Sequence, residues 1–208
     1  MKQDQRKKQK NLAGLVKKVR RYGDADAFVE LMELCRESMI KVAKSYLPNE
    51  EDAADAVQDA ILTCYEKLDT LKNPEYFRTW LIRIVINKCK DFLKTNRPAV
   101  SLEDAPELHA WDYTQEHLEF MELLQSMDEK YRTILVLYYS EGFRTSEIAD
   151  LLELNENTVR TRLARARAQF ARQYQEEEEL NARPETAQEQ GRKWKGGDAR
   201  EKTAGFLL

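Results

Sequence analysis

The chain has 208 residues and a formal net charge of −3 at pH 7, and 42% of its residues are hydrophobic and 34% charged. This length suits one ordinary domain or two small ones, and the scarcity of turn residues, 7 Gly and 5 Pro, favours a mostly helical fold. No stretch reaches the roughly 18 apolar residues of a membrane span, and the basic N-terminus lacks the apolar run of a secretory signal. We therefore expect a cytoplasmic protein without stable membrane insertion.

Charge is distributed unevenly along the chain. Residues 1–21 hold nine Lys or Arg and one Asp, and residues 78–97 hold six basic residues and one acid. Residues 98–129, by contrast, hold nine acids and no Lys or Arg. Basic segments that could face nucleic acid thus stand beside an acidic one. We interpret residues 1–23 as a basic N-terminal arm.

Residues 24–97 are predicted to form a first helical block. Apolar residues recur at three- and four-residue spacing over 27–47, 49–68 and 74–95, which is the pattern of amphipathic helices. The third helix carries its apolar residues at Phe77, Trp80, Leu81, Ile84, Val85, Cys89 and Phe92. Its other face offers Arg83, Asn87, Lys88, Lys90, Asp91 and Lys94. A basic helix with aromatic residues beside it suits a single nucleic-acid strand, although we expect Trp80 itself to pack in the core.

A linker is predicted at 98–117, where two prolines, several acids and weak periodicity replace the helical pattern. Both histidines, His109 and His117, fall within it. We interpret them as solvated polar residues, because a metal site would need further ligands at helical or turn spacing. Residues 175–208 lose periodicity in a run of acids, mixed charge and glycines, and we expect this tail to be disordered.

The second predicted helical block is 118–174. Its segment 126–129 has the form of a capping box before a helix over 131–139, and Gly142 is expected to end that helix in the left-handed conformation. A short helix at about 146–152, a turn of three residues and a longer final helix then follow. Two helices joined by such a short turn are the pattern of a helix-turn-helix, whose second helix enters the major groove of DNA.

The final helix is expected to begin near Glu156 with Asn155 as its N-cap. Its inner stripe is Val159, Leu163, Ala166 and Phe170. Its outer face carries Asn157, Thr158, Arg160, Thr161, Arg162, Arg165 and Arg167. Residues 157–172 include five Arg and no acid, whereas a solvated helix usually mixes both signs, so contact with DNA bases and phosphates is predicted.

Three segments, in this order and spacing, resemble the extracytoplasmic-function group of bacterial RNA polymerase sigma factors. They are 52–62, 77–94 and 131–172. The resemblance covers about residues 24–172 and implies an all-α fold of two small helical domains joined by a flexible acidic linker. By this resemblance, 24–97 is sigma region 2 and 118–174, with the helix-turn-helix, is sigma region 4.

The resemblance also implies core RNA polymerase and promoter DNA as partners. The 49–68 helix would dock on the clamp of the largest polymerase subunit through a face made of Asp52, Asp55, Gln58 and Asp59. The 77–94 helix would contact the melted −10 element through Arg83, Asn87, Lys88, Lys90 and Lys94, and the 156–168 helix would read the duplex −35 element through its outer face. The group often has a membrane-anchored anti-sigma factor, and the sequence shows no surface dedicated to one.

Two positions depart from the pattern of the group. Gly often stands in the turn of its helix-turn-helix and Ser often caps the first helix, but here Glu153 and Arg144 stand there. Thr145 could cap that helix instead. A left-handed Glu153 would cost about 1 kcal/mol.

The alternative function is that of a polymerase-independent helix-turn-helix transcription regulator, which would usually need a dimer and would not need the 49–94 segment. An enzyme is not predicted, because the chain lacks a Gly-rich phosphate loop, a nucleophile motif and a clustered metal set. The three cysteines, Cys35, Cys64 and Cys89, are odd in number and lack metal-ligand spacing. Neither a metal, a cofactor nor a disulfide framework is therefore expected.

Overall fold

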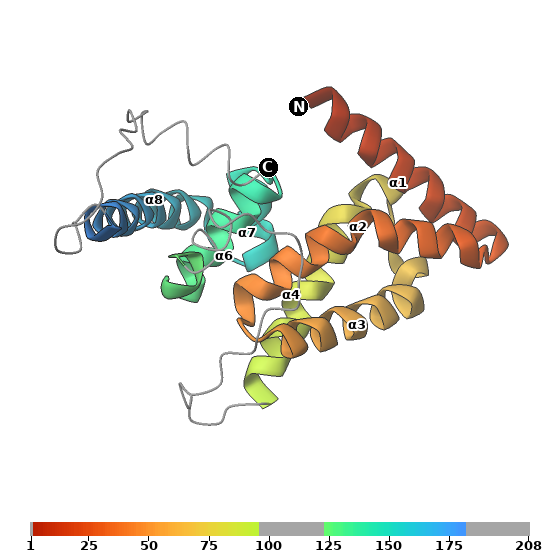
Figure 1. Cartoon of the computed structure of the whole chain (residues 1–208). Coiled ribbons are helices and arrows are strands. Elements are labelled where there is room, and N and C mark those ends of the chain that lie inside the picture. Colours follow the sequence, from red (N-terminus) through yellow and green to blue (C-terminus); the bar gives the residue numbers. More distant parts are fainter. Residues whose placement is uncertain (1, 96–122, 182–208) are drawn as a thin grey trace, which may run out of the picture. The chain divides into compact units, whose positions relative to one another are not determined.

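A computed structural model describes residues 2–95 and 123–181, with side chains described for 9–95 and 123–172. The regular structure in these ranges is helical, which confirms the predicted all-α class (Figure 1). The chain divides into two compact units, residues 1–107 and 108–208. The predicted linker at 98–117 lies outside the described residues.

The first unit contains four long helices in its described part. α1 (Lys2–Tyr22) and α2 (Ala25–Tyr46) form a helical hairpin, and α3 (Glu50–Lys67) follows (Figure 1). Two short 3₁₀ turns, η1 (Leu68–Thr70) and η2 (Pro74–Tyr76), then lead into α4 (Phe77–Thr95). α2 and α4 form the centre of the unit, since each of them packs against the other three long helices, and α1 also contacts η2.

Short polar caps and one glycine determine where these helices begin. Asp24 accepts a hydrogen bond from the Ala27 amide at 2.9 Å at the start of α2, and Asn49 accepts from the Asp52 amide at 3.0 Å at the start of α3. Gly23, between α1 and α2, has a φ of 63°, a left-handed conformation that glycine adopts without steric cost. The observed boundaries of α2, α3 and α4 therefore lie close to the predicted ones.

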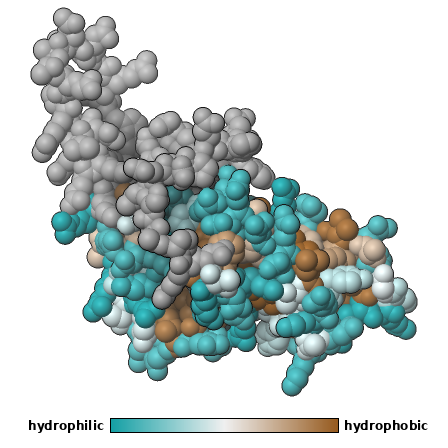
Figure 2. Space-filling view, turned by 90° about the horizontal axis from the view of Figure 1, so that it is seen from below, coloured by the Kyte–Doolittle hydropathy of each residue, from teal (hydrophilic) through white to brown (hydrophobic). Residues whose placement is uncertain are grey.

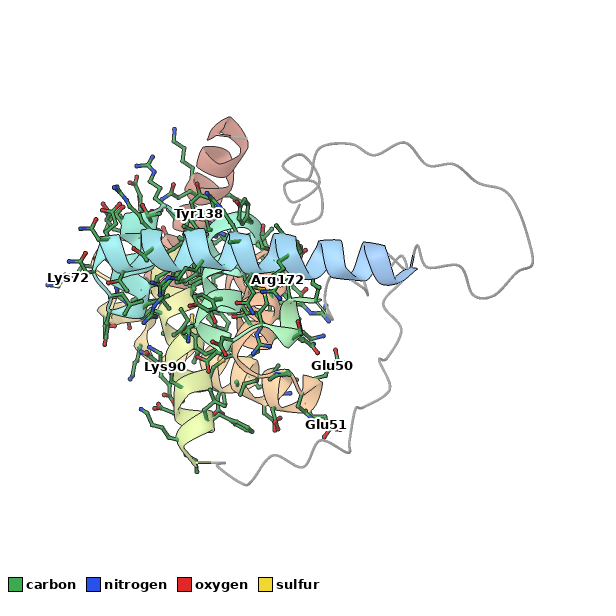
Figure 3. All side chains as sticks on the ribbon, turned by 90° about the vertical axis from the view of Figure 1, so that its left-hand side faces the viewer. Glu50, Glu51, Lys72, Lys90, Tyr138 and Arg172 are labelled. Atoms are coloured by element: carbon green, nitrogen blue, oxygen red, sulfur yellow. The ribbon has the colours of Figure 1, made fainter. Side chains whose placement is uncertain are left out.

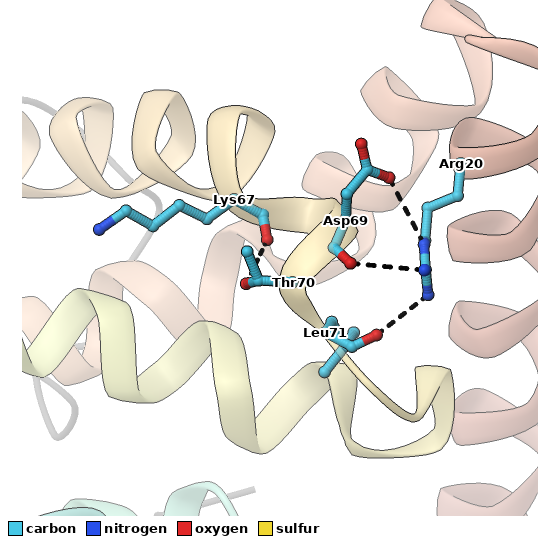
Figure 4. A network of polar contacts seen from close by, with 5 residues as sticks. All are labelled: Arg20, Lys67, Asp69, Thr70 and Leu71. Carbon is cyan, nitrogen blue, oxygen red and sulfur yellow. Dashed lines mark hydrogen bonds and ion pairs between the residues drawn. The ribbon is translucent and has the colours of Figure 1, made fainter.

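The structure places a packed helix where the sequence indicated only a basic arm. α1 buries Leu12, Ala13, Leu15, Val16 and Val19. Arg20 ties it to the segment after α3: its guanidinium donates to the carbonyls of Leu71 at 3.0 Å and Asp69 at 3.4 Å, and its Nε lies 3.5 Å from the Asp69 carboxylate (Figure 4). The first unit thus includes α1, and residue 24 lies inside a hairpin rather than at an edge of the unit.

α4 buries a face that is rotated from the predicted one. Phe77, Leu81, Val85 and Cys89 are buried as expected, and Ile82 and Ile86 are buried as well. Trp80, Ile84 and Phe92 are only half-buried. The expectation that Trp80 is a core residue is therefore wrong in part: its ring packs against Phe77 with centroids 6.1 Å apart, but it keeps a share of the surface. The reason is that both α2 and α3 pack against α4, which draws the buried face toward Ile82 and Ile86.

The cysteines belong to this core. Cys35, Cys64 and Cys89 are buried, and none of the three forms a disulfide. Burial, with a smaller contribution from Cys35, raises the pKa of the Cys64 thiol to about 12. Cys64 is therefore a core residue with an unreactive thiol at neutral pH.

The second unit contains the helix-turn-helix. α6 (Glu129–Leu135) continues into a π-helical turn, η3 (Val136–Ser140), and α7 (Thr145–Leu152) and α8 (Glu156–Asn181) follow. α6 and α7 both pack against α8. The core of this unit includes Ile134, Leu135, Leu137, Ile148 and Leu151. Gly142, after the π turn, has a φ of 66°, which confirms the predicted left-handed position.

The capping box predicted at 126–129 does not form. Residues 123–126 are themselves helical, so Ser126 stands at the end of a helix, and its hydroxyl donates to the carbonyl of Leu123 at 2.8 Å. Asp128 takes the N-cap position of α6 without a side-chain cap. The buried Arg132 instead links α6 to the helical segment before it, because its Nη1 donates to the Gln125 carbonyl at 3.0 Å. Burial lowers the pKa of Arg132.

α8 extends beyond the predicted end of the second block at residue 174. It continues to Asn181, so the first part of the predicted disordered tail is helical. The run of glutamates at 176–179 explains this, because glutamate is a good helix former. Residues 182–208 lie outside the described residues. Across the described ranges the surface shown in Figure 2 is mostly hydrophilic, and no helix there has the length and apolarity needed to cross a membrane.

Candidate nucleic-acid and polymerase interfaces

The turn between α7 and α8 is built around one strained residue and one cap. Glu153 has φ 58° and ψ 44°, the left-handed conformation that costs a non-glycine residue about 1 kcal/mol. The amide of Leu154 donates back to the Ala149 carbonyl at 2.9 Å, which closes the turn. Asn155 accepts from the Asn157 amide at 2.8 Å, so it caps α8 as predicted. The predicted inner stripe is buried throughout: Val159, Leu163, Ala166 and Phe170.

Thr145 joins the two helices of the motif rather than capping the first. The N-cap position of α7 is Arg144, whose amide donates to Glu147 Oε2 at 2.8 Å. The Thr145 hydroxyl donates to Glu156 Oε1 at 2.7 Å, and the same oxygen accepts from Arg160 at 2.8 Å. These two hydrogen bonds, that from Thr145 first, lower the pKa of Glu156. The start of α7 is thereby tied to the first turn of α8.

The predicted outer residues of α8 separate into two groups. Asn157, Thr161 and Arg165 follow one another at i, i+4 and i+8 and are exposed, and Thr158 and Arg162 stand beside them, half-buried. Arg160 and Arg167 lie seven residues apart on another flank. Both are exposed, but both contact side chains of their own unit. We call the first group the open group, because it is the part of α8 that is most accessible to a groove of duplex DNA.

The π turn explains the contacts of Arg167. Tyr138 and Tyr139 are neighbours in sequence, yet their rings meet edge to face at 5.0 Å, and the Arg167 guanidinium lies 5.3 Å and 5.4 Å from their centroids. The wider π turn lets two successive tyrosines reach the same cation. Sequence periodicity alone predicted an α-helix here and could not have indicated this cluster.

On α4, four of the five predicted −10 residues share a face. Arg83, Asn87, Lys90 and Lys94 recur at i, i+4, i+7 and i+11, and Trp80 continues this row three residues before Arg83. Figure 3 labels Lys90 on this helix. The half-buried Trp80 is a residue of this surface that the sequence interpretation assigned to the core; its i, i+3, i+7 spacing to Arg83 and Asn87 was the signal that could have found it.

The fifth residue, Lys88, points to a different neighbour. Its Nζ lies 3.9 Å from Asp59 Oδ2 of α3, and its side chain is 31% exposed. Lys88 therefore stands at the boundary between the predicted nucleic-acid face of α4 and the predicted polymerase face of α3. The structure brings these two predicted surfaces together along the contact of α3 with α4.

The predicted polymerase face of α3 is exposed except at its start. Asp55, Gln58 and Asp59 are exposed, and Asp52 is half-buried (Figure 3 shows Glu50 and Glu51 at the same helix end). Burial first, and then the charges of Asp55 and Glu51, raise the pKa of Asp52. The sequence interpretation missed two apolar neighbours on this helix: Leu62 is 63% exposed and Tyr65 is 64% exposed. Leu62 follows Asp55 by seven residues and so continues the acidic row.

Comparison with protein families accounts for both units. The model for sigma-70 region 2 matches residues 31–98, and the model for sigma-70 region 4 matches residues 117–170. The RNA polymerase sigma factor SigV of Bacillus subtilis is 31% identical over 134 residues, which are 63% of this chain and 81% of SigV. The ECF RNA polymerase sigma-E factor of Escherichia coli is 30% identical over 171 residues, 74% of this chain and 88% of that protein. The chain belongs to the extracytoplasmic-function group of sigma factors.

Solved structures agree with this membership. CnrH, solved in complex with the cytosolic domain of CnrY, matches this sigma factor with a TM-score of 0.58 and 26% identity over 84% of this chain and 99% of CnrH. The sigma factor RpoE, solved with the anti-sigma factor NepR from Bartonella quintana, has a TM-score of 0.61 and 20% identity over 76% of this chain and 98% of RpoE, which shows the shared fold. This sigma factor binds core RNA polymerase and directs it to promoter DNA for transcription initiation.

Proposed function

We propose that this sigma factor divides polymerase binding and promoter recognition among three helical faces, two on the first unit and one on the second. The acidic row of α3 binds core polymerase, the basic row of α4 holds the melted −10 strand, and the open group on α8 reads the duplex −35 element. The observation that carries this division is the alignment of Trp80 with Arg83, Asn87, Lys90 and Lys94 along one face of α4. A ring followed by cations and an amide suits unstacked bases and their phosphates.

The polymerase face combines charge with apolar contact. Asp55 and Asp59 supply exposed carboxylates, and Leu62 supplies an exposed apolar side chain one turn further on. Charges of this kind steer association and fix orientation, while an apolar side chain near the centre of an interface contributes affinity. The Lys88–Asp59 pair at 3.9 Å joins this face to the strand-binding face, so polymerase docking and strand capture involve adjacent groups.

The α8 face suits a duplex. Asn157 and Thr158 stand in its first turn, which a recognition helix usually inserts first into the groove. Asn matches the major-groove edge of adenine, and Arg matches guanine or a phosphate. Thr161 donates its hydroxyl to the Asn157 carbonyl at 2.8 Å, which restrains its rotamer and favours a methyl contact with thymine. Arg165, two turns after Asn157, contacts the phosphate backbone of the DNA.

We further infer that the protein acts in the cytoplasm and performs no reaction of its own, because chemistry in transcription belongs to the polymerase it guides. An anti-sigma factor is a further proposed partner. Its support is the solved complex of the related fold with NepR. A polymerase-independent regulator would bind promoter DNA equally well with or without core polymerase.

The test is a reconstituted initiation assay with the full chain, core polymerase and a promoter. Charge reversal at Asp55 and Asp59 should weaken core binding by on the order of 2–3 kcal/mol, since like charges then face the partner. Alanine at Asn87, Lys90 and Lys94 should leave core affinity intact and impair open-complex formation, with partial rescue on a template with a pre-melted bubble. Charge reversal at Glu33 and Glu37 of α2 is the matched control. Unchanged core affinity for the Asp55 and Asp59 variant would remove α3 from the interface.

A further inference from the structure

The exposed face of α1 carries a row of cations that none of the three proposed interfaces uses. Lys10, Lys17, Lys18 and Arg21 recur at i, i+7, i+8 and i+11, and all four are exposed. They lie opposite the apolar residues that α1 buries in the first unit. No acid occurs between residues 10 and 21. At 1.5 Å per residue, this row is about 16 Å long.

The cations of this row are not neutralised by the described part of the chain. No ion pair joins Lys10, Lys17, Lys18 or Arg21 to an acid among the described residues, and Arg21 instead lies 5.4 Å from the centroid of the Tyr22 ring. Asp69 lines a shallow hollow together with Lys17, Arg20 and Arg21, but Arg20 already engages it (Figure 4). The hollow therefore keeps a surplus of positive charge.

Gly14 stands in the middle of the row, four residues after Lys10 and three before Lys17. A glycine inside a helix is destabilising relative to alanine. The fold does not require it here, because a Cβ added at Gly14 would meet no atom within 4 Å and the residue is exposed. A missing side chain at the centre of an exposed basic face allows another backbone to approach closely.

We propose that α1 is a fourth contact surface, which holds backbone phosphates of promoter DNA beside the −10 element with Gly14 at the closest approach. This proposal rests on the proposed role of α4. α1 packs against α4 and against η2, the turn that precedes it, so both basic faces belong to one compact unit. Successive phosphates of one strand are about 3.4 Å apart along the duplex axis, so a row of about 16 Å spans about five of them.

The charge test compares two double variants of the full chain in complex with core polymerase. Lys17→Gln with Arg21→Gln removes two charges from α1, and Arg36→Gln with Lys41→Gln removes two from α2, where Arg36 is exposed and Lys41 half-buried. We expect the α1 variant to weaken promoter binding for all sequences alike and to lower the salt slope by about one unit for each phosphate that the variant no longer binds. The α2 control should keep both. An unchanged slope, or a loss of core affinity in place of promoter affinity, overturns the proposal. If the unsubstituted holoenzyme fails to bind promoters, the proposed function fails instead.

Gly14 provides a test that separates DNA binding from stability. Gly14→Ala and Gly14→Gln should both raise the melting temperature, because each replaces glycine with a better helix former. Gly14→Gln should nevertheless weaken promoter binding by on the order of tenfold, because its side chain would hold the DNA backbone away from the neighbouring cations. Gly14→Ala, which adds one carbon, should weaken it less. Promoter affinity for Gly14→Gln equal to that of the unsubstituted chain would show that no backbone approaches this position.

Discussion

α4 and α8 both present rows of basic and amide side chains, but their surroundings differ. On α4, Asn87 and Lys90 continue a row that begins at the half-buried ring of Trp80. On α8, no ring contact involves the open group among the described residues, and Arg160 and Arg167 are engaged within their own unit. Aromatic rings bind unstacked bases, whereas a capped helix N-terminus with small polar side chains fits a groove. Similar charge patterns can therefore serve a melted strand or a duplex, depending on the residues beside them.

The largest expected effect comes from removing the ring on α4. Trp80→Ala should reduce open-complex formation by on the order of 1–3 kcal/mol, because stacking on an aromatic ring contributes that much per base. Trp80→Phe should restore part of this, since it keeps a ring. Ile84→Ala, another half-buried position on the same helix, is the control and should affect thermal stability but not strand capture. A loss for Trp80→Ala that follows its melting temperature alone would assign Trp80 to packing and remove the contrast with α8.

The next effect distinguishes base reading from backbone contact on α8. Asn157→Ala should relax preference at one −35 position by roughly 1–3 kcal/mol, whereas Arg165→Ala should weaken binding to all sequences and lower the salt slope by about one unit. Binding of holoenzyme to single-base promoter variants at two salt concentrations measures both. Arg160→Ala is the comparison variant, and it should change binding less because its guanidinium already contacts Glu156. Identical uniform losses for all three would mean that specificity comes from DNA shape.

A smaller effect tests the strained turn that positions α8. Glu153→Gly should stabilise the second unit by up to about 1 kcal/mol, because glycine adopts the left-handed conformation without the steric cost that glutamate incurs. Glu153→Val should destabilise it, since a β-branched residue tolerates a positive φ poorly. Thermal unfolding of the full chain measures both. Equal stability of the Gly and Val variants would contradict the left-handed geometry.

The smallest effect concerns the hydrogen bond from Thr145 to Glu156, which ties α7 to α8. Hydrogen bonds from Thr145 and Arg160 lower the pKa of Glu156, so its carboxylate stabilises the folded state. This contribution is fully present above the unfolded-state pKa, ordinarily 4.5, and is lost as pH falls through the lower folded-state pKa. Glu156→Gln should therefore be slightly less stable than the unsubstituted chain at pH 7 and equal to it in acid. A stability difference independent of pH would exclude the charge as its cause.

Local patterns predicted the helix-turn-helix well because its determinants are local. Asn155 caps α8 as expected, Gly142 adopts the expected left-handed conformation, and the stripe from Val159 to Phe170 is buried. The predicted capping box at Ser126 failed because residues 123–126 are themselves helical and the Ser126 hydroxyl donates to the Leu123 carbonyl of that helix. The π turn at 136–140 could not be predicted either, because hydrophobic periodicity of 3.6 residues indicates only an α-helix.

By itself, the sequence determined the helical class, the order of the helices and the family motifs, because hydrophobic periodicity and capping act over a few residues. Only the tertiary structure decided which side chains are buried, which stay exposed and which of them meet across helices. Packing of α2 and α3 on α4 left Trp80 at the surface, the approach of α3 brought Asp59 to Lys88, and the hairpin with α2 turned a basic arm into a packed helix with Gly14 on its open face. These outcomes depend on which helix packs against each face, and the sequence of one helix does not specify which other helix that is.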